Sequence, residues 1–310
     1  MADGAIPSVI DLRGDVRRRR RERSVRALFF ASAVFSIVIS VGIILSLAGG
    51  TIDFLRKVDL GALITLGRWD PRTNDFNVLA ILAGTLQVAA VAMIVATPLG
   101  IGSALYLSEF ASPRARRFLK PVLETLASVP SVVMGFFALR FITPDLVQRL
   151  FPGAEFFNVL GAGIAVGLLV TPLVASVSED AMHAVPMALR EAAFGLGARR
   201  PATAVRVVIP AAVSGIAAAM ILGISRAIGE TMVVAIAAGG TGGTELKFNL
   251  LEGTQTMTAA ITALATGSDQ VRGAGAAYPS LFFVGMLLFA LTFVLNAVSE
   301  RFVRRVRKAY

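Results

Sequence analysis

The sequence of 310 residues lacks cysteine and contains a single histidine and a single tryptophan. Without cysteine, disulfides and Cys-ligated metal sites are excluded. His183 has no partner cluster in the sequence, so a histidine-based zinc or catalytic site is not expected. Acidic residues are too sparse to suggest paired catalytic carboxylates, and no glycine-rich phosphate loop ends in Lys-Ser or Lys-Thr. We therefore expect no catalytic or metal-binding residue, and no ATP hydrolysis by this chain alone.

Apolar residues are abundant instead. They make up 55% of the chain against 16% charged residues, and the mean hydropathy is +0.74, which is too apolar for an ordinary soluble domain. A spanning helix needs about 20 mainly apolar residues. We predict an all-α membrane protein with six spans, at residues 27–48, 78–105, 118–141, 158–178, 209–238 and 280–299. One six-span domain, 27–300, would lie between basic tails at 1–26 and 301–310.

The basic residues are distributed unevenly along the chain, whose net charge is +10. Of its 30 Lys and Arg residues, 21 lie in the segments expected inside if the N-terminus is inside, and 7 lie in those expected outside. This asymmetry predicts that both termini are cytoplasmic. The run "RRRRRER" at 17–23 directly precedes a span. We therefore interpret it as a determinant of membrane orientation, or as a contact with anionic lipid, and not as a nucleic-acid-binding segment. That span is too long for a signal-peptide core.

Three further patterns predict local structure in or beside the spans. The apolar run 254–266 is too short to span a membrane and suits a re-entrant or outer-surface helix. Pro130 should kink the span at 118–141, with neighbouring serines satisfying the freed backbone groups. Gly163 and Gly167 form a GxxxG spacing, which is typical of close helix packing.

The predicted loop at 179–210 carries the most specific motif. It contains Glu191, Ala192 and Ala193, then three residues, Gly197, nine residues and the sequence "VVIP" ending at Pro210. Helix-forming residues on both sides of Gly197 predict two short helices, because glycine permits a tight junction. Pro210 suits the first turn of the next span. A protruding helix pair of this kind is a docking surface for a partner, although an ordinary helical connector is the alternative.

That spacing resembles the EAA loop of bacterial ABC importer permeases, with Val207 and Ile209 in place of the Ile and Leu of the family pattern. Longer stretches resemble the PstC-type permeases of bacterial phosphate-specific ABC importers. They are 98–139, 170–198, "ILGISRAIGETMVVAIAAG" at 221–239 and "QTMTAAI" at 255–261. The match covers most of residues 78–300, whereas the N-terminal tail and first outer loop contribute little. The sequence "GETM" at 229–232 favours the PstC type over its PstA-type sister.

The resemblance implies a type I ABC permease fold with a cytoplasmic EAA loop, in the bacterial inner membrane. It implies four kinds of partner: a PstA-type second permease, a PstB-type ATPase dimer that carries the ATP and Mg, an external PstS-type phosphate-binding protein, and inorganic phosphate. Glu191, Ala192, Ala193, Gly197 and Pro210 would couple the ATPase to the spans. A permease for sulfate or molybdate is an alternative, and a signalling role in phosphate sensing can accompany transport.

Two charges stand in the otherwise apolar sequence "SRAIGETMVV". Arg226 and Glu230 are one helical turn apart, so they should share a face of the predicted span 209–238 and face the substrate pathway or a subunit interface. Arg226 suits a phosphate anion, which its guanidinium binds with two parallel hydrogen bonds. Glu230 would either balance Arg226 or accept a hydrogen bond from the P–OH group. The alternative is a structural ion pair between helices. Arg140 would attract anions to an outer vestibule, or extend to the lipid headgroups.

Overall fold

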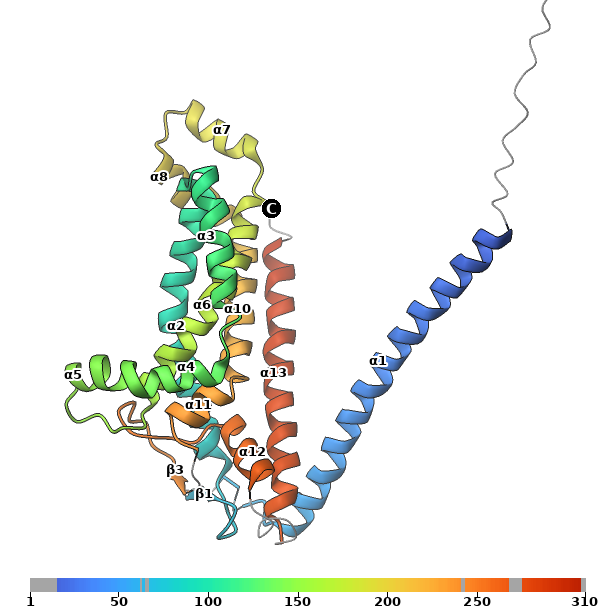
Figure 1. Cartoon of the computed structure of the whole chain (residues 1–310), viewed down its shortest axis with the longest axis vertical. Coiled ribbons are helices and arrows are strands. Elements are labelled where there is room, and N and C mark those ends of the chain that lie inside the picture. The colour runs from blue at the N-terminus through green and yellow to red at the C-terminus, as the bar shows by residue number, and fades with distance from the viewer. Residues whose placement is uncertain (1–15, 62, 65–66, 241–242, 268–274, 308–310) are drawn as a thin grey trace, which may run out of the picture. The chain divides into compact units, whose positions relative to one another are not determined.

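The computed structural model describes residues 16–61, 63–64, 67–240, 243–267 and 275–307, and the described chain is mainly helical (Figure 1). The helical elements, with η for π-helical segments, are α1 (Val16–Lys57), α2 (Val78–Leu105), η1 (Tyr106–Phe110), α3 (Pro113–Leu126), α4 (Ser131–Phe137), η2 (Ala138–Val147), α5 (Gln148–Leu150), α6 (Val159–His183), α7 (Met187–Gly195), α8 (Arg200–Thr203), η3 (Ala204–Val208), α9 (Ile209–Ala211), α10 (Val213–Ile228), α11 (Met232–Ala237), α12 (Met257–Thr266) and α13 (Ala277–Arg307). The strands are β1 (Arg68–Asp70), β2 (Asp75–Phe76) and β3 (Thr244–Glu245). Parts of both predicted basic tails, 1–15 and 308–310, lie outside the described residues.

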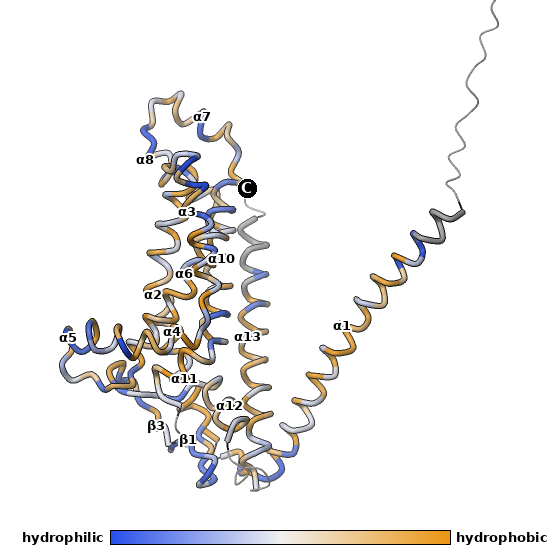
Figure 2. Tube along the Cα trace, in the orientation of Figure 1, coloured by the Kyte–Doolittle hydropathy of each residue, from blue (hydrophilic) through white to orange (hydrophobic). Residues whose placement is uncertain are grey.

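By length and composition, five helices in the described part can cross a membrane, or six if one bent helix pair counts as a span. The predicted spans 27–48, 78–105 and 280–299 each lie within one helix, α1, α2 and α13, and the span at 158–178 corresponds to α6. Figure 2 shows apolar residues along most of α2, α6, α10 and α13, with hydrophilic residues gathered near α8 and β1. The prediction of an all-α membrane protein is confirmed.

The chain divides into two units, residues 1–49 and 50–310. The first consists, in its described part, of most of α1, whose large side chains such as Phe29 and Phe35 are apolar and exposed. The second contains the remaining elements. Its largest hydrophobic cluster joins α2, α6, η2, α10 and α11.

Close packing between α2 and α6 depends on the two glycines of the GxxxG spacing. A Cβ atom at Gly163 would lie 2.5 Å from the Cβ of Val91, and one at Gly167 would lie 2.7 Å from the carbonyl oxygen of Ala92. A larger side chain at either position would force the helices apart. The packing predicted from the spacing is therefore confirmed, and it fixes the two central helices of the bundle.

The prediction of one kinked helix over 118–141 is wrong. Helix α3 ends at Leu126, and Pro130 is the residue that caps the start of α4. Proline lacks the N–H that would continue the helix and disfavours a helical conformation in the preceding residue. Ser128 closes the end of α3 by donating its hydroxyl to the carbonyl oxygen of Thr125, at 2.6 Å. In Figure 1, α4, η2 and α5 run across the upright helices, so the break replaces the expected kink.

The prediction of one continuous helix over 209–238 is also wrong. The segments Arg200–Ala211 and Val213–Ile228 meet at an angle of 72°, and a second break separates α10 from α11 at residues 229–231. The first-turn position predicted for Pro210 is also wrong, because Pro210 lies near the end of the helical segment Arg200–Ala211, before the bend at Ala212, and α10 begins only at Val213. Gly229 is the C-cap residue of α10, and its N–H donates to the carbonyl oxygen of Ser225 at 3.1 Å.

A small sheet and α12 lie at the end of the bundle opposite α7 (Figure 1). The strand order is β2-β1-β3, and both pairs are antiparallel, with Trp69 opposite Phe76 and Thr244. Trp69 is fully buried here against Phe76. Helix α12 begins at Met257 because the Thr256 hydroxyl accepts the N–H of Ala259 at 3.2 Å. The helix expected over 254–266 is thus confirmed, with a later start.

Candidate coupling site and candidate substrate path

Helix α7 ends in a tight turn at the glycine of the EAA spacing. Gly197 has a φ of +80°, a backbone conformation that is unfavourable for residues with a Cβ atom. Its N–H donates to the carbonyl oxygen of Phe194 at 2.9 Å, and the N–H of Ala198 donates to that of Ala193 at 3.0 Å. These two bonds form a Schellman motif, which satisfies the last carbonyls of the helix. The predicted junction of two short helices at Gly197 is therefore confirmed.

The tip of this loop is open to the surroundings. Glu191 and Ala192 are exposed, and Ala193 is half-buried. Leu196 is 89% exposed and Phe194 is 44% exposed, so apolar side chains stand beside a carboxylate on the same protrusion. An exposed apolar patch rimmed by polar groups is typical of a surface that binds another protein.

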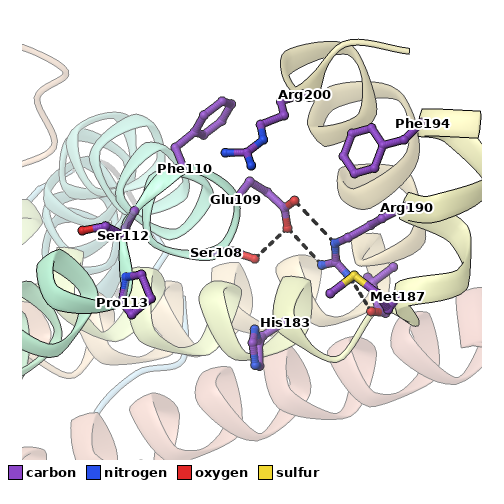
Figure 3. Close-up of a pocket in the computed structure, with 12 residues that line it drawn as sticks. Ser108, Glu109, Phe110, Ser112, Pro113, His183, Met187, Arg190, Phe194 and Arg200 are labelled. Atoms are coloured by element: carbon purple, nitrogen blue, oxygen red, sulfur yellow. Dashed lines mark hydrogen bonds and ion pairs between the residues drawn. The ribbon is translucent and has the colours of Figure 1, made fainter. Parts of the chain in front are cut away.

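The base of the loop is held by Arg190, which is 9% exposed. Its Nη2 donates to Glu109 Oε1 at 2.9 Å and to the carbonyl oxygen of Met182 at 2.8 Å, and its Nη1 donates to the carbonyl oxygen of Val185. Ser108 donates its hydroxyl to the same Glu109 oxygen at 2.9 Å. Figure 3 shows the Arg190 and Glu109 side chains pointing toward each other from α7 and η1.

A second buried carboxylate lies in α6. Glu179 is fully buried between two cations of α3: Arg116 donates to its Oε1, and Lys120 donates to its Oε2 at 2.7 Å. Lys120 also lies 3.2 Å from Asp180. His183, which the sequence left without a partner, has its Nδ1 3.4 Å from Arg116 Nη1. The cluster joins the first half of α3 to the C-terminal end of α6.

Sequence reasoning missed both of these ion-pair groups. Glu109 and Arg190 are 81 residues apart, and Arg116 and Glu179 are 63 apart, so spacing gives no sign that they meet. The available signal was chemical: Glu109 follows an apolar helix, and Arg190 directly precedes Glu191 of the motif. A carboxylate and a guanidinium that become buried at such positions need partners.

Arg226 and Glu230 do not share a helix face. Arg226 is exposed in the last turn of α10, whereas Glu230 is half-buried in the break after that helix. The expected i, i+4 geometry is wrong because α10 ends at Ile228. Among the described residues, no ion pair includes Arg226, Glu230 or Arg140. Arg140 is exposed on η2, so the structure places the three candidate charges on three separate segments.

The main chain of Glu230 is held by α12. The Thr258 hydroxyl donates to the Glu230 carbonyl oxygen at 2.7 Å, and the Glu230 N–H donates to that of Ala227 at 3.3 Å. Helix α12 is itself tied to α2, because the Met257 N–H donates to the Thr85 hydroxyl at 2.9 Å. The break that carries Glu230 is thus a defined structure supported from a neighbouring helix.

A cavity of about 340 Å³ lies after α11, at the end opposite α7. Two carboxylates, Glu155 and Glu245, and the amine of Lys247 line it. The hydrogen bond from Lys247 to Glu252 raises the pKa of the amine above its usual value. The hydrogen bond from Asn249, together with that from Lys247, lowers the pKa of Glu252. Because its carboxylates outnumber its cation, the cavity itself does not favour an anion.

Solved structures share this fold. A bacterial alginate ABC transporter, in complex with an alginate-bound periplasmic protein, contains a chain with a TM-score of 0.65 and 15% identity, covering 94% of this chain and 97% of its own. The MetNI methionine ABC transporter in an inward-facing conformation contains one with a TM-score of 0.53 and 18% identity, covering 72% and 91%. These likenesses identify the fold as that of type I ABC importer permeases.

Relatives identified by sequence define a narrower family than the fold does. The phosphate transport system permease protein PstC of Mesorhizobium japonicum is 30% identical, covering 97% of this chain and 96% of its own. The PstC protein of Pasteurella multocida is 28% identical over 90% of both chains. A probable ABC transporter permease protein of Bacillus subtilis, YqgH, is 32% identical over 73% of this chain and 74% of its own. Residues 96–308 match the family described as binding-protein-dependent transport system inner membrane component. The chain belongs to that family, and within it to the PstC-type permeases.

Proposed function

We propose that this chain is a transmembrane permease subunit of an ATP-driven phosphate importer. The observation that carries the proposal is the likeness to PstC of Mesorhizobium japonicum over 97% of the chain. The exposed α7–Gly197 turn supports it, because a helix that protrudes at one end of the bundle gives a partner ATPase a surface through which to move the spans.

The proposed importer divides its work among subunits. A PstB-type ATPase dimer would bind ATP and Mg²⁺, so this chain would hold no cofactor of its own. A PstA-type permease would complete the path, and an external PstS-type protein would deliver inorganic phosphate. The apolar tip at Phe194 and Leu196, with Glu191 beside it, would contact the ATPase. ATP binding would then bias the spans between two conformations by displacing this loop.

Arg226 is the proposed cation of the path. An arginine at the centre of a spanning helix costs about 2.5–3.5 kcal/mol on insertion scales, so its exposed position on α10 favours the subunit interface over lipid. A guanidinium there would compensate the phosphate charge. Glu230, at the adjacent break, would balance Arg226 or accept a hydrogen bond from the P–OH group. Arg140 would attract anions from the outer side or extend to headgroups.

The orientation follows from charge. We infer from the basic excess that the α7 end and both chain termini lie in the cytoplasm of a bacterium, and that the sheet and α12 lie outside the inner membrane. A C-terminal reporter enzyme that is active only in the cytoplasm should therefore be active, and a matched reporter that requires export should be inactive. The reverse result would contradict this orientation.

The test of function is uptake of labelled phosphate by bacterial cells that lack a high-affinity phosphate importer. Cells that express this chain with its three partner subunits should accumulate phosphate, and omission of this chain should abolish the gain. Accumulation of sulfate or molybdate in place of phosphate would assign the chain to another oxyanion. Full uptake without the PstA-type subunit would contradict the assigned place of this chain in a two-permease path.

A further inference from the structure

Arg190, directly before Glu191, is buried, whereas most other residues of α7 are exposed. Arg190 is 9% exposed, whereas Glu191 and Ala192 are exposed. The guanidinium uses all three of its nitrogens, since Nε lies 3.4 Å from Glu109 Oε2 and the two Nη atoms donate to Glu109, Met182 and Val185. One side chain thus joins the start of α7 to the end of α6 and to η1.

Glu109 is suited to carry force from this contact. It lies in η1, which continues α2 without a break, so a pull on its carboxylate acts on a helix of the bundle. Glu109 is itself held by the Ser108 hydroxyl, and the α3 segment that follows is tied to α6 through Glu179. The η1–α3 turn is therefore anchored on both sides.

Elsewhere α7 and this turn are separated by space. A cavity of about 660 Å³ lies between them, lined by residues that include Phe110, Phe194 and Arg200 (Figure 3). Within the described part of the chain, the polar contacts between α7 and η1 are those of Arg190 with Glu109. Because a buried charge left without its partner is strongly unfavourable, the pair resists separation when the loop is displaced.

We propose that Arg190 and Glu109 form the joint through which displacement of the α7–Gly197 turn reaches α2 and α3. Both are positioning residues: the ATPase contacts the exposed tip, and the buried pair makes the tip and the end of α2 move together. This inference rests on the proposed function, because it requires a motor that pushes on the loop. The inference assigns the transmission of this displacement to two buried residues that are not among the exposed residues of the EAA motif.

The first test measures phosphate delivered per ATP hydrolysed by the complete transporter in proteoliposomes. Coupling between sites typically changes an equilibrium by 5 to 150-fold, so we expect Glu109→Gln and Arg190→Lys to lower this ratio about tenfold. The control is Asp145→Asn, which breaks the exposed Asp145–Arg149 pair and should leave the ratio unchanged. A purely structural role would reduce the yield of complex but not the ratio. An unchanged ratio in assembled Glu109→Gln transporter would overturn the proposal.

The second test does not depend on transport, and it applies even if a variant fails to assemble. The chain has no cysteine, so spin labels can be placed at Arg114→Cys in α3 and Ala188→Cys in α7, with partner subunits made cysteine-free. With the native pair present, the distance between the labels should be the same in the nucleotide-free and ATP-bound complex. A distance that differs between these two states would overturn the proposal that Arg190 and Glu109 form a joint. A wild-type complex that hydrolyses ATP without moving phosphate would contradict the proposed function, and the distance would still decide the inference.

Discussion

At the scale of single residues, Arg226 is an exposed cation on an otherwise apolar helix. No ion pair among the described residues satisfies it, so the structural pairing with Glu230 that the sequence allowed is not formed within this chain. An unpaired guanidinium at membrane depth needs a partner from a second subunit, water or an anion.

Arg226→Ala should abolish phosphate uptake and leave insertion and complex yield intact, because only the compensating charge for the anion is removed. Arg226→Lys should restore little, since an ammonium lacks the planar fork. Uptake and complex yield are measured together, with the exposed Arg149→Ala as control. Transport by an Arg226→Met/Glu230→Leu double variant would refute the role proposed for Arg226.

Glu230→Gln distinguishes the two roles open to this carboxylate. If Glu230 balances Arg226, its neutralisation should strengthen phosphate binding and slow release, so uptake falls at an unchanged selectivity. If it accepts the P–OH hydrogen, sulfate should become a competitor, because the site no longer leaves a buried acceptor unpaired with that anion. Competition by sulfate in uptake assays is the readout. Normal rates and normal selectivity would exclude both roles.

At the scale of elements, the coupling turn depends on one backbone conformation. Gly197→Ala should weaken the turn by about 1–2 kcal/mol, because alanine disfavours the positive φ that the Schellman motif requires. We expect less phosphate per ATP with normal insertion. Gly195→Ala, in the last turn of α7 with open space around it, is the matched control. If the two variants couple equally well, the conformation of Gly197 is not what coupling requires.

The contact between α2 and α6 depends on the absence of a side chain. Gly167→Ala should destabilise the protein by about 1–3 kcal/mol, because the added Cβ would meet the Ala92 carbonyl oxygen at 2.7 Å. Gly102→Ala, where nothing lies within 4 Å, should be neutral or slightly stabilising. The thermal unfolding midpoint of the detergent-solubilised complex provides the measure. Equal midpoints for the two variants would contradict the packing account.

Elements with a strong local signal could be predicted from sequence. Long apolar runs bounded by polar segments locate α1, α2, α6 and α13, and the Gly197 spacing locates the helix junction. The helix breaks near Pro130 and Gly229, which divide the predicted third and fifth spans, could not be predicted from the sequence. Proline in a membrane helix allows either a kink or an end, and neighbouring helices decide which. At residue 230 the decision involves Thr258, which lies 28 positions away.

The candidate site shows the same limit. The exposed motif residues Glu191 and Gly197 could be found from spacing, because they lie within one short segment. The buried pair Arg190–Glu109 could not be found in this way, because it forms only when α7 packs beside η1 at the end of α2. Contacts between segments distant in sequence depend on tertiary packing, which one sequence does not display.

At the scale of the whole molecule, the two ends of the second unit have different chemistry. The α7 end carries a protruding turn above buried ion pairs, and the opposite end carries a small sheet, α12 and a cavity lined by carboxylates. Between them, breaks in the predicted third and fifth spans interrupt the upright helices (Figure 1). This arrangement suits a permease that a partner subunit moves at the α7 end.

The central claim is that this chain carries phosphate in an ATP-driven importer. The most direct measurement is accumulation of labelled phosphate by proteoliposomes that contain the purified four-component transporter, with sulfate and molybdate as competitors. We predict accumulation that requires ATP, the binding protein and this chain, and that excess sulfate or molybdate does not reduce. Accumulation of sulfate or molybdate in place of phosphate, or phosphate entry that is independent of ATP, would contradict the account.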